Sequence, residues 1–277
     1  METFFSFLER RIDDCSSLLC IGLDPHISDL EHPTAASALE FSLNLVRQTA
    51  PYAAAFKPNA AFFEQFGSRG WSALKGVIAA IQQESQRRGS MIPVILDAKR
   101  GDIASTAEAY AESAFNRLGA HCITLSPYLG KDSVDPFITN QEKGVFLLCK
   151  TSNPGSGDLQ DLALEGGELL YERVARLASQ WNTGNNIGLV VGATQPEAMA
   201  RIRAAVPELW FLAPGVGAQG GNLETALQAG LRKDGRGMLL PVSRGISRAA
   251  NPGLAAAELR DQIIALQHSL RPGARTH

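Results

Sequence analysis

Long apolar runs and a strong excess of either charge are both missing from this sequence. No uninterrupted apolar stretch approaches the roughly 18 residues that a membrane-spanning helix needs. Charged residues at positions 9–14 also interrupt the phenylalanine-rich start before a signal-peptide core could form. The formal net charge is -2, which gives no indication of a nucleic-acid partner. We therefore expect a cytoplasmic protein that engages neither membranes nor nucleic acids.

Metal-binding and disulfide patterns are missing too. The four cysteines show no C-x-x-C spacing, and three of them lie in or beside apolar runs, which is typical of reduced, buried thiols in a cytosolic protein. The five histidines have no ligand spacing with cysteines or carboxylates, so we predict no bound metal. The residues concerned are Cys15, Cys20, Cys122, Cys149, His26, His32, His121, His268 and His277.

What the sequence does contain is a regular alternation of short apolar runs with longer segments of helical period. This alternation implies parallel strands joined by crossover helices, and 277 residues suit a (β/α)8 barrel, which typically needs about 250. No linker interrupts the pattern. We predict an α/β fold: a single-domain TIM barrel over residues 1–277, rather than an open doubly wound sheet, with an amphipathic N-terminal helix closing one end. The strand candidates are residues 18–23, 53–56, 92–96, 122–125, 145–149, 187–191, 210–213 and 238–242.

The third strand candidate acquires charges where it ends, in V-I-L-D-A-K-R-G-D-I. Asp97 and Lys99 are two residues apart, and on a strand that spacing points both side chains to the same face. They lie at the C-terminal end of the strand, where barrel active sites form. A buried ion pair or a solvated strand end is the alternative. Burying two charges costs several kcal/mol per ion, so stability is a weak reason for such a pair, and we favour a functional one.

Other charged residues follow neighbouring strands. Lys57 ends the second strand in F-K-P-N, and Asp24 ends the first in G-L-D-P. Alone, Lys57 fits a surface lysine and Asp24 a turn residue. Because three strands deliver these charges to equivalent ends, we interpret them as one charged site. Asp102 need not share it, since five residues can span up to about 17 Å; before I-A-S-T it looks like a helix N-cap.

Two loops near the C-terminus have the composition of a phosphate site. A-P-G-V-G-A-Q-G-G follows the seventh strand, and P-V-S-R-G-I follows the eighth. Glycine N–H groups can approach an anion, Gln219 can donate, and Arg244 can bind phosphate oxygens bidentately; barrels frequently bind phosphate at these loops. The G-x-G-x-x-G spelling also suggests a dinucleotide site, but too few strands follow it for that fold. A glycine turn without a ligand is the other alternative, and Arg244 counts against it.

Together these motifs resemble those of orotidine 5′-phosphate decarboxylase, in the bacterial branch that carries D-A-K-R-G-D-I. G-L-D-P, F-K-P-N, D-A-K-R-G-D-I, T-S-N-P-G, P-G-V-G-A-Q-G-G and S-R-G-I occur in the family's order over nearly the whole chain. The resemblance implies decarboxylation of orotidine 5′-monophosphate to UMP and CO2, the last step of de novo pyrimidine nucleotide biosynthesis. It also implies a homodimer with a shared active site.

The resemblance assigns the chemistry to three residues. It makes Lys99 the proton donor to C6 of the pyrimidine and Asp97 the carboxylate facing the leaving group, with Lys57 orienting both. Loss of CO2 leaves a carbanion whose lone pair lies in the ring plane, so an electron-sink cofactor would have little to accept, and we expect none. A fixed ammonium can stabilise that charge and then protonate it.

The remaining roles concern binding and assembly. The resemblance implies that Asp24 holds the ribose, that Ser152 contacts the pyrimidine, and that Pro214, Gln219 and Arg244 surround the base and the phosphate. It places Asp102, Ile103 and Thr106 at the dimer interface, where Asp102 and Thr106 would reach the neighbouring subunit's site.

Other functions use similar residues. A lyase acting on a sugar phosphate could use the same D-x-K-x-x-D arrangement, and a Schiff-base aldolase could use Lys57 or Lys99. A non-catalytic barrel would bind UMP without releasing CO2. A dinucleotide oxidoreductase would instead bind NAD.

Overall fold

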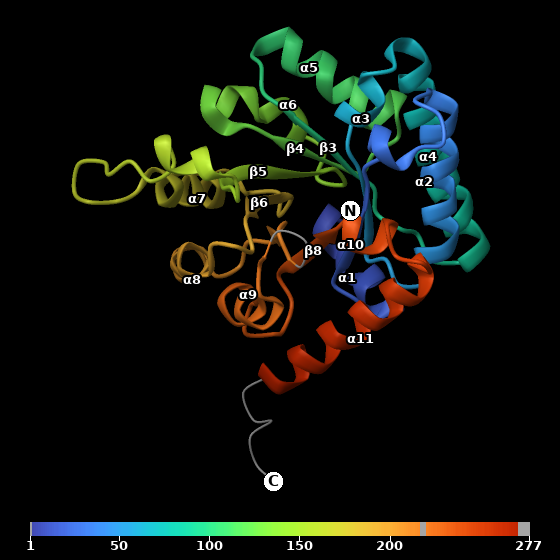
Figure 1. The fold of residues 1–277 in the computed structure, drawn as a ribbon. Helices are drawn as coiled ribbons and strands as arrows, with labels where there is room; N and C mark the ends of the chain where they lie inside the picture. The colour runs from blue at the N-terminus through green and yellow to red at the C-terminus, as the bar shows by residue number, and fades with distance from the viewer. Residues whose placement is uncertain (1, 217–219, 271–277) are drawn as a thin grey trace.

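The computed structural model of the chain describes residues 2–216 and 220–270. Eight parallel strands form a barrel in the order β2-β1-β8-β7-β6-β5-β4-β3, surrounded by helices (Figure 1). This confirms the predicted (β/α)8 fold. The strands are β1 (Leu19–Leu23), β2 (Ala55–Pro58), β3 (Ile95–Arg100), β4 (Cys122–Leu125), β5 (Gly144–Lys150), β6 (Ile187–Val191), β7 (Phe211–Leu212) and β8 (Met238–Val242).

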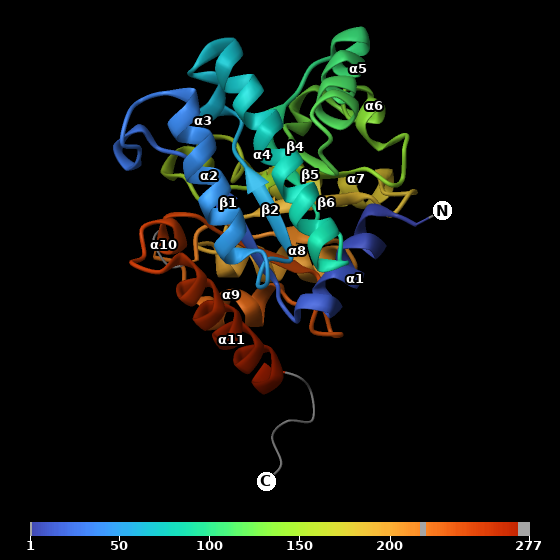
Figure 2. The ribbon, with the colours of Figure 1, turned by 90° about the vertical axis from the view of Figure 1, so that its right-hand side faces the viewer.

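Helices follow the strands and cover the outside of the barrel (Figure 2). The α-helices are α1 (Phe4–Cys15), α2 (Ala35–Thr49), α3 (Ala61–Glu64), α4 (Gly67–Arg88), α5 (Ala104–Glu112), α6 (Asp135–Ile138), α7 (Leu170–Trp181), α8 (Pro196–Ala205), α9 (Leu223–Gly230), α10 (Arg244–Ser247) and α11 (Pro252–Leu270). Shorter turns are η1 (Ile27–Asp29), the π-helical η2 (Ser113–Arg117), η3 (Pro127–Leu129), η4 (Lys131–Ser133) and η5 (Pro154–Asp158). No helix in the two described ranges is both long and apolar enough to span a membrane.

The barrel closes between β2 and β3 through isolated parallel bridges. Phe56 pairs with Val94, and Asn59 pairs with Asp97. The backbone N–H of Phe56 donates to Pro93 at 2.9 Å, and that of Ala60 donates to the carbonyl of Asp97 at 3.1 Å. The last bond fixes the backbone of β3 at its charged end against the chain that follows Lys57.

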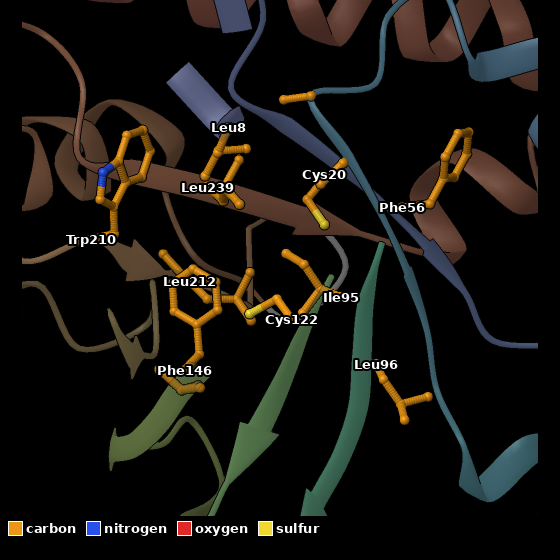
Figure 3. Close-up of a cluster of buried hydrophobic side chains, with 14 of the residues drawn as sticks. Leu8, Cys20, Phe56, Ile95, Leu96, Cys122, Phe146, Trp210, Leu212 and Leu239 are labelled. Carbon is orange, nitrogen blue, oxygen red and sulfur yellow. The ribbon is translucent and has the colours of Figure 1, made fainter. Parts of the chain in front are cut away.

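The N-terminal helix α1 closes the end of the barrel where the strands begin. Its apolar spacing puts Phe4, Phe5 and Leu8 on the buried face. Phe5 stacks on Trp210, just before β7, with ring centroids 5.7 Å apart. Gly144, the first residue of β5, has no side chain because a Cβ there would lie 2.2 Å from the Phe4 ring. Leu8, Leu239 and Trp210 meet in this part of the core (Figure 3).

The strand bounds agree best where an apolar run is sharply delimited. β4, β6 and β8 begin and end where the sequence predicts. β3 differs, because it starts at Ile95 rather than at residue 92 and continues through the charged segment to Arg100. All four cysteines are buried and free, as predicted.

Candidate active site

A cavity of about 660 Å³ opens at the C-terminal ends of the strands. Its walls come from both halves of the barrel, which brings together residues that are far apart in the sequence. Seven of the residues predicted from the sequence line it: Asp24, Lys57, Asp97, Lys99, Ser152, Pro214 and Arg244.

Asp97 lies at the centre of the charged wall, between two ammonium groups. Its Oδ2 is 2.6 Å from Lys57 Nζ, and its Oδ1 is 2.5 Å from Lys99 Nζ. The side chains of Asp97 and Lys57 are only 10% and 9% exposed, whereas that of Lys99 is 50% exposed. Lys99 is therefore the member of the group that a ligand in the cavity meets first.

Mutual attraction keeps the buried pair charged. Burial alone would raise the pKa of Asp97, but the ammonium groups of Lys57 and Lys99 outweigh it and hold that pKa well below its usual range. Burial would lower the pKa of Lys57, yet the carboxylates of Asp97 and Asp24 raise it overall. Asp97 and Lys57 thus stay ionised at neutral pH, and each requires the other.

The reason for the contact between Asp97 and Lys99 is not regular strand alternation. Lys99 has φ +46°, in the left-handed region, which a non-glycine residue rarely adopts. The pairing of β3 with β4 also shifts between Leu96 and Arg100. The two charges thus lie together as the sequence predicts, but the backbone that brings them together is a bulge.

Asp24 and its neighbours form the wall at the end of β1. Among the described residues, no hydrogen-bond partner reaches Asp24 Oδ1 or Ser243 Oγ, although both atoms are buried. Gly22 keeps this corner open, because a Cβ there would lie 2.8 Å from the Cβ of Ser243. Such unsatisfied acceptors and hydroxyls in a cavity wall are suited to a polar ligand such as a sugar.

The wall at the ends of β7 and β8 carries the predicted phosphate residues. Pro214 and Gly215 line the cavity after β7, and Gly215 has φ +109°. Arg244 is exposed at the first position of α10 and makes no ion pair with any acidic residue in the described part of the chain. Gln219 lies outside the described residues. The guanidinium of Arg244 thus faces the cavity with its charge uncompensated.

The loop after β5 forms the third side of the cavity. Ser152 packs against Gly192, where an added Cβ would lie 3.1 Å from the Ser152 Cβ. Buried Lys150 anchors the loop through Asp161, with its Nζ 2.7 Å from Oδ1. The Thr151 N–H donates to Gln160 Oε1 at 2.9 Å. These contacts with Asp161 and Gln160 hold the segment that carries Ser152 in place.

Asp102, Ile103 and Thr106 are not brought to this cavity. Asp102 Oδ1 accepts from the N–H of Ile103 at 2.8 Å, and the residue capping α5 is Ile103, so Asp102 is not the helix N-cap that the sequence suggested. Ile103 is 52% exposed, and Tyr128 on the neighbouring loop is 81% exposed. Ile103 and Tyr128 thus expose apolar side chains outside the cavity.

Several cavity residues have no obvious signal in the sequence. Asn59, Phe62 and His26 line the cavity, and the rings of His26 and Phe62 contact edge to face with centroids 4.3 Å apart. Thr124, inside the apolar run C-I-T-L, donates its hydroxyl to Asp97 Oδ1 at 3.1 Å. The one available clue to Thr124 is a polar residue in a fully buried strand. The described residues contain no group of three or more histidine, cysteine or acidic residues that could hold a metal.

The chain is similar to known proteins over most of its length. Residues 17–259 match the family described as Orotidine 5′-phosphate decarboxylase / HUMPS family. The orotidine 5′-phosphate decarboxylase of Roseiflexus castenholzii is 47% identical over 273 residues, which cover 95% of this chain and 97% of that one. The solved structure of Leishmania donovani OMP decarboxylase matches with a TM-score of 0.87 at 54% identity, over 96% of this chain and 98% of that chain. Leishmania donovani UMP synthase matches with a TM-score of 0.89 at 55% identity, over 97% of this chain but only 57% of that chain.

Proposed function

The chain belongs to the orotidine 5′-phosphate decarboxylase / HUMPS family, and we propose that it converts orotidine 5′-monophosphate to UMP and CO2 in the cavity described above. This reaction is the last step of de novo pyrimidine nucleotide biosynthesis. The observation that carries the proposal is the Lys57–Asp97–Lys99 group on one wall of the cavity, with Arg244 on another. We assign the whole of residues 1–277 to one catalytic domain in the cytoplasm; the buried, free thiols support that location.

The chemistry needs a cation next to one ring carbon. The bond from C6 to the carboxylate breaks, CO2 departs, and the electron pair stays on C6 in the plane of the ring. The ammonium of Lys99 stabilises that charge and then gives its proton to C6, which yields UMP and a neutral amine that solvent reprotonates. Because the ammonium is positioned before the reaction, little reorganisation accompanies the development of charge.

Asp97 and Lys57 make that position possible. Asp97 contacts Lys99 Nζ directly, and Lys57 compensates the same carboxylate from the other side. Asp97 also faces the leaving carboxylate of the substrate. Each of the three charged groups therefore has a separate role, as proton donor, facing carboxylate or orienting cation.

The rest of the nucleotide is bound away from C6. We assign Asp24 to the ribose hydroxyls, Ser152 to the pyrimidine, and Pro214, Gln219 and Arg244 to the region of the base and the phosphate. The unsatisfied Asp24 Oδ1 and the uncompensated Arg244 support these assignments. Binding energy from the phosphate is available to hold the reacting end in place.

Formation of UMP from orotidine 5′-monophosphate by the purified protein, in the presence of a chelator, tests the proposed function. We expect turnover that the chelator leaves unchanged. A sugar-acid phosphate as the alternative substrate separates a related lyase, and borohydride trapping separates a Schiff-base aldolase. Binding of UMP without release of CO2 from orotidine 5′-monophosphate would identify a non-catalytic barrel and contradict the proposal.

We further propose that the protein is a homodimer in which Asp102 and Thr106 reach the neighbouring subunit's site and Ile103 packs at the interface. Two observations support the homodimer. Asp102, Ile103 and Thr106 do not line the cavity of their own subunit. The apolar side chains of Ile103, Tyr128 and Leu129 are exposed. A two-fold interface uses the same patch on both subunits, so each subunit would complete the other's site.

Mixing inactive subunits tests the shared site. Lys99→Ala and Asp102→Ala subunits, inactive alone, should regain up to about one quarter of wild-type activity when half of the dimers are mixed and one of two sites in each is intact. Lys99→Ala with Lys57→Ala is the matched control, because both residues belong to one subunit's site and no recovery is expected. Mixed dimers that stay inactive would contradict the shared site.

A further inference from the structure

The charged end of β3 is bulged opposite one residue of β4. Leu96 pairs with Ile123 and Arg100 pairs with Leu125. Three residues of β3, from Asp97 to Lys99, therefore face Thr124 alone. A bulge of this kind leaves backbone N–H groups without their ladder partners and redirects a side chain.

The side chain of Thr124 takes the place of the missing ladder bonds. Its Oγ1 accepts from the N–H of Ala98 at 3.1 Å and from the N–H of Lys99 at 2.9 Å. Thr124 is 1% exposed, so those N–H groups have this hydroxyl in place of water. A buried backbone N–H that loses such a partner lowers the stability of the fold.

The direction of the third hydrogen bond follows by elimination. A threonine hydroxyl has two acceptor lone pairs and one proton. The two backbone donors occupy both lone pairs, so the proton must point elsewhere, and Asp97 Oδ1 lies 3.1 Å away. That oxygen is the one that Lys99 Nζ contacts at 2.5 Å. One side chain therefore holds the backbone of Lys99 and the carboxylate that its ammonium contacts.

We propose that Thr124 is a positioning residue for the decarboxylation. It holds Lys99 in its left-handed conformation, at φ +46°, and keeps a hydrogen bond on Asp97 Oδ1 while the ammonium of Lys99 turns from that oxygen toward the carbon it protonates. This inference rests on the proposed function. Thr124 acts through Asp97 and Lys99 and forms no bond with the substrate carbon.

Threonine suits the position better than its nearest relatives in size. Valine has the same shape but leaves the two N–H groups and Asp97 Oδ1 without the hydroxyl. Serine keeps the hydroxyl but lacks the methyl group that restricts rotation about χ1 in a β-branched side chain. The two substitutions therefore separate the hydroxyl from the shape.

Steady-state kinetics and UMP binding of Thr124→Val and Thr124→Ser test the proposal. We expect Thr124→Val to lower kcat about 10- to 100-fold, the range for losing a hydrogen bond to a charged group, with KM and the UMP dissociation constant within about twofold of wild type. Thr124→Ser should keep kcat within about threefold of wild type, because the hydroxyl can still make the three bonds. Thr49→Val is the matched control, since it removes a buried hydroxyl on α2 that bonds to Leu45 and lies outside the cavity.

Three outcomes would overturn the proposal: Thr124→Val with kcat near that of wild type, equal losses of kcat and UMP affinity, or a serine variant as slow as the valine variant. If Thr124→Val fails to fold, the same comparison is made with Thr124→Ala. Wild-type protein that makes no UMP would instead reject the proposed function, so the two failures are distinguishable.

Discussion

The two ends of the barrel hold cationic side chains against different partners. Where the strands begin, Arg203 ends on backbone carbonyls: it donates to Leu209 at 2.7 Å, to Gly237 at 3.0 Å and to Gly230 at 2.9 Å. Arg11 similarly donates to Ala50 at 2.7 Å. Where the strands end, Lys57 and Lys99 converge on the carboxylate of Asp97. At the first end, backbone carbonyls of the protein satisfy the guanidinium groups. At the second end, several charges lie together next to a cavity.

Most of the buried polar atoms without a hydrogen-bond partner among the described residues lie where the strands end. Asp24 Oδ1, Ser243 Oγ and Thr194 Oγ1 are buried at or after the C-terminal ends of strands, and none has a hydrogen-bond partner in the part of the chain that the structure describes. At the other end, Asn186 donates from its amide to the carbonyls of Ile138 and Lys143. Satisfied polar groups stabilise a fold, whereas unsatisfied ones beside a cavity await a ligand. Satisfied polar groups therefore lie where the strands begin, and the cavity in which we place the reaction lies where they end.

Lys99→Ala should have the largest effect and affect chemistry alone. We expect kcat to fall on the order of 10⁴-fold, since the variant lacks the ammonium that we propose as both the proton donor and the cation at C6. The free energy of unfolding should change by less than about 1 kcal/mol, because the ammonium is half exposed. Decarboxylation assays, UMP binding and urea unfolding measure this, with exposed Lys75→Ala on α4 as the control. Near-normal turnover would remove Lys99 from the chemistry.

Arg244→Ala should have the next largest effect, and it should depend on the phosphate. We expect kcat/KM for orotidine 5′-monophosphate to fall about 100-fold, because the variant lacks the guanidinium that we propose binds the phosphate bidentately. Turnover of the phosphate-free nucleoside should not change. Nearby Arg248, which pairs with Asp29, provides the matched alanine control. Equal losses for nucleotide and nucleoside would show that Arg244 does not bind the phosphate.

Arg203→Met should have the opposite effect, on stability alone. Burial lowers the pKa of Arg203 to about 9, and its guanidinium lies 3.7 Å from the centre of the Phe211 ring. Removing it leaves several carbonyls unsatisfied, so we expect the free energy of unfolding to drop by about 3 kcal/mol. At temperatures where the variant is folded, kcat should equal that of wild type. Exposed Arg117→Met is the control, and a lower kcat in folded Arg203→Met would break the division between the ends.

His121→Asn should have the smallest effect, confined to acid. The Nδ1 of His121 accepts from the N–H of Val94 at 3.1 Å, and burial lowers the pKa of the imidazole from 6.5 to about 4. The neutral form is thus favoured in the folded state. The neutral imidazole therefore adds to the free energy of unfolding above pH 6.5. As the pH falls toward 4, that free energy decreases by about 2–3 kcal/mol.

Asparagine can accept the same bond without titrating. The variant should therefore lose less stability than wild type between pH 7 and pH 4.5, as measured by urea unfolding at both values. Identical losses in the two proteins would show that His121 does not set the acid sensitivity of this end.

The sequence predicts the barrel because an apolar run of strand length can be recognised locally, without knowledge of which strands it pairs with. β4, β6 and β8 have the predicted bounds. The chain also reveals Lys57, Asp97 and Lys99, since charges at the ends of apolar strands are conspicuous. Topology alone then brings equivalent strand ends together, so their clustering needs no further information.

The details that the sequence does not reveal depend on pairing between strands. A regular strand was the basis for grouping Asp97 with Lys99, and the bulge opposite Thr124 cannot be read from either strand separately. Threonine is common in β-strands, so the sequence gives no sign that Thr124 bonds to Asp97 and Lys99. The N-cap interpretation of Asp102 failed because helix starts shift by one residue with local φ and ψ, and Ile103 occupies that position.

A crystal structure of the protein with bound UMP tests the central claim most directly. We predict that C6 of the pyrimidine lies about 3 Å from Lys99 Nζ, at hydrogen-bond distance, and that the phosphate contacts Arg244 across the cavity. A nucleotide bound in the reverse orientation, with its phosphate on Lys57 or Lys99, would contradict the claim, as would binding outside the C-terminal end of the barrel.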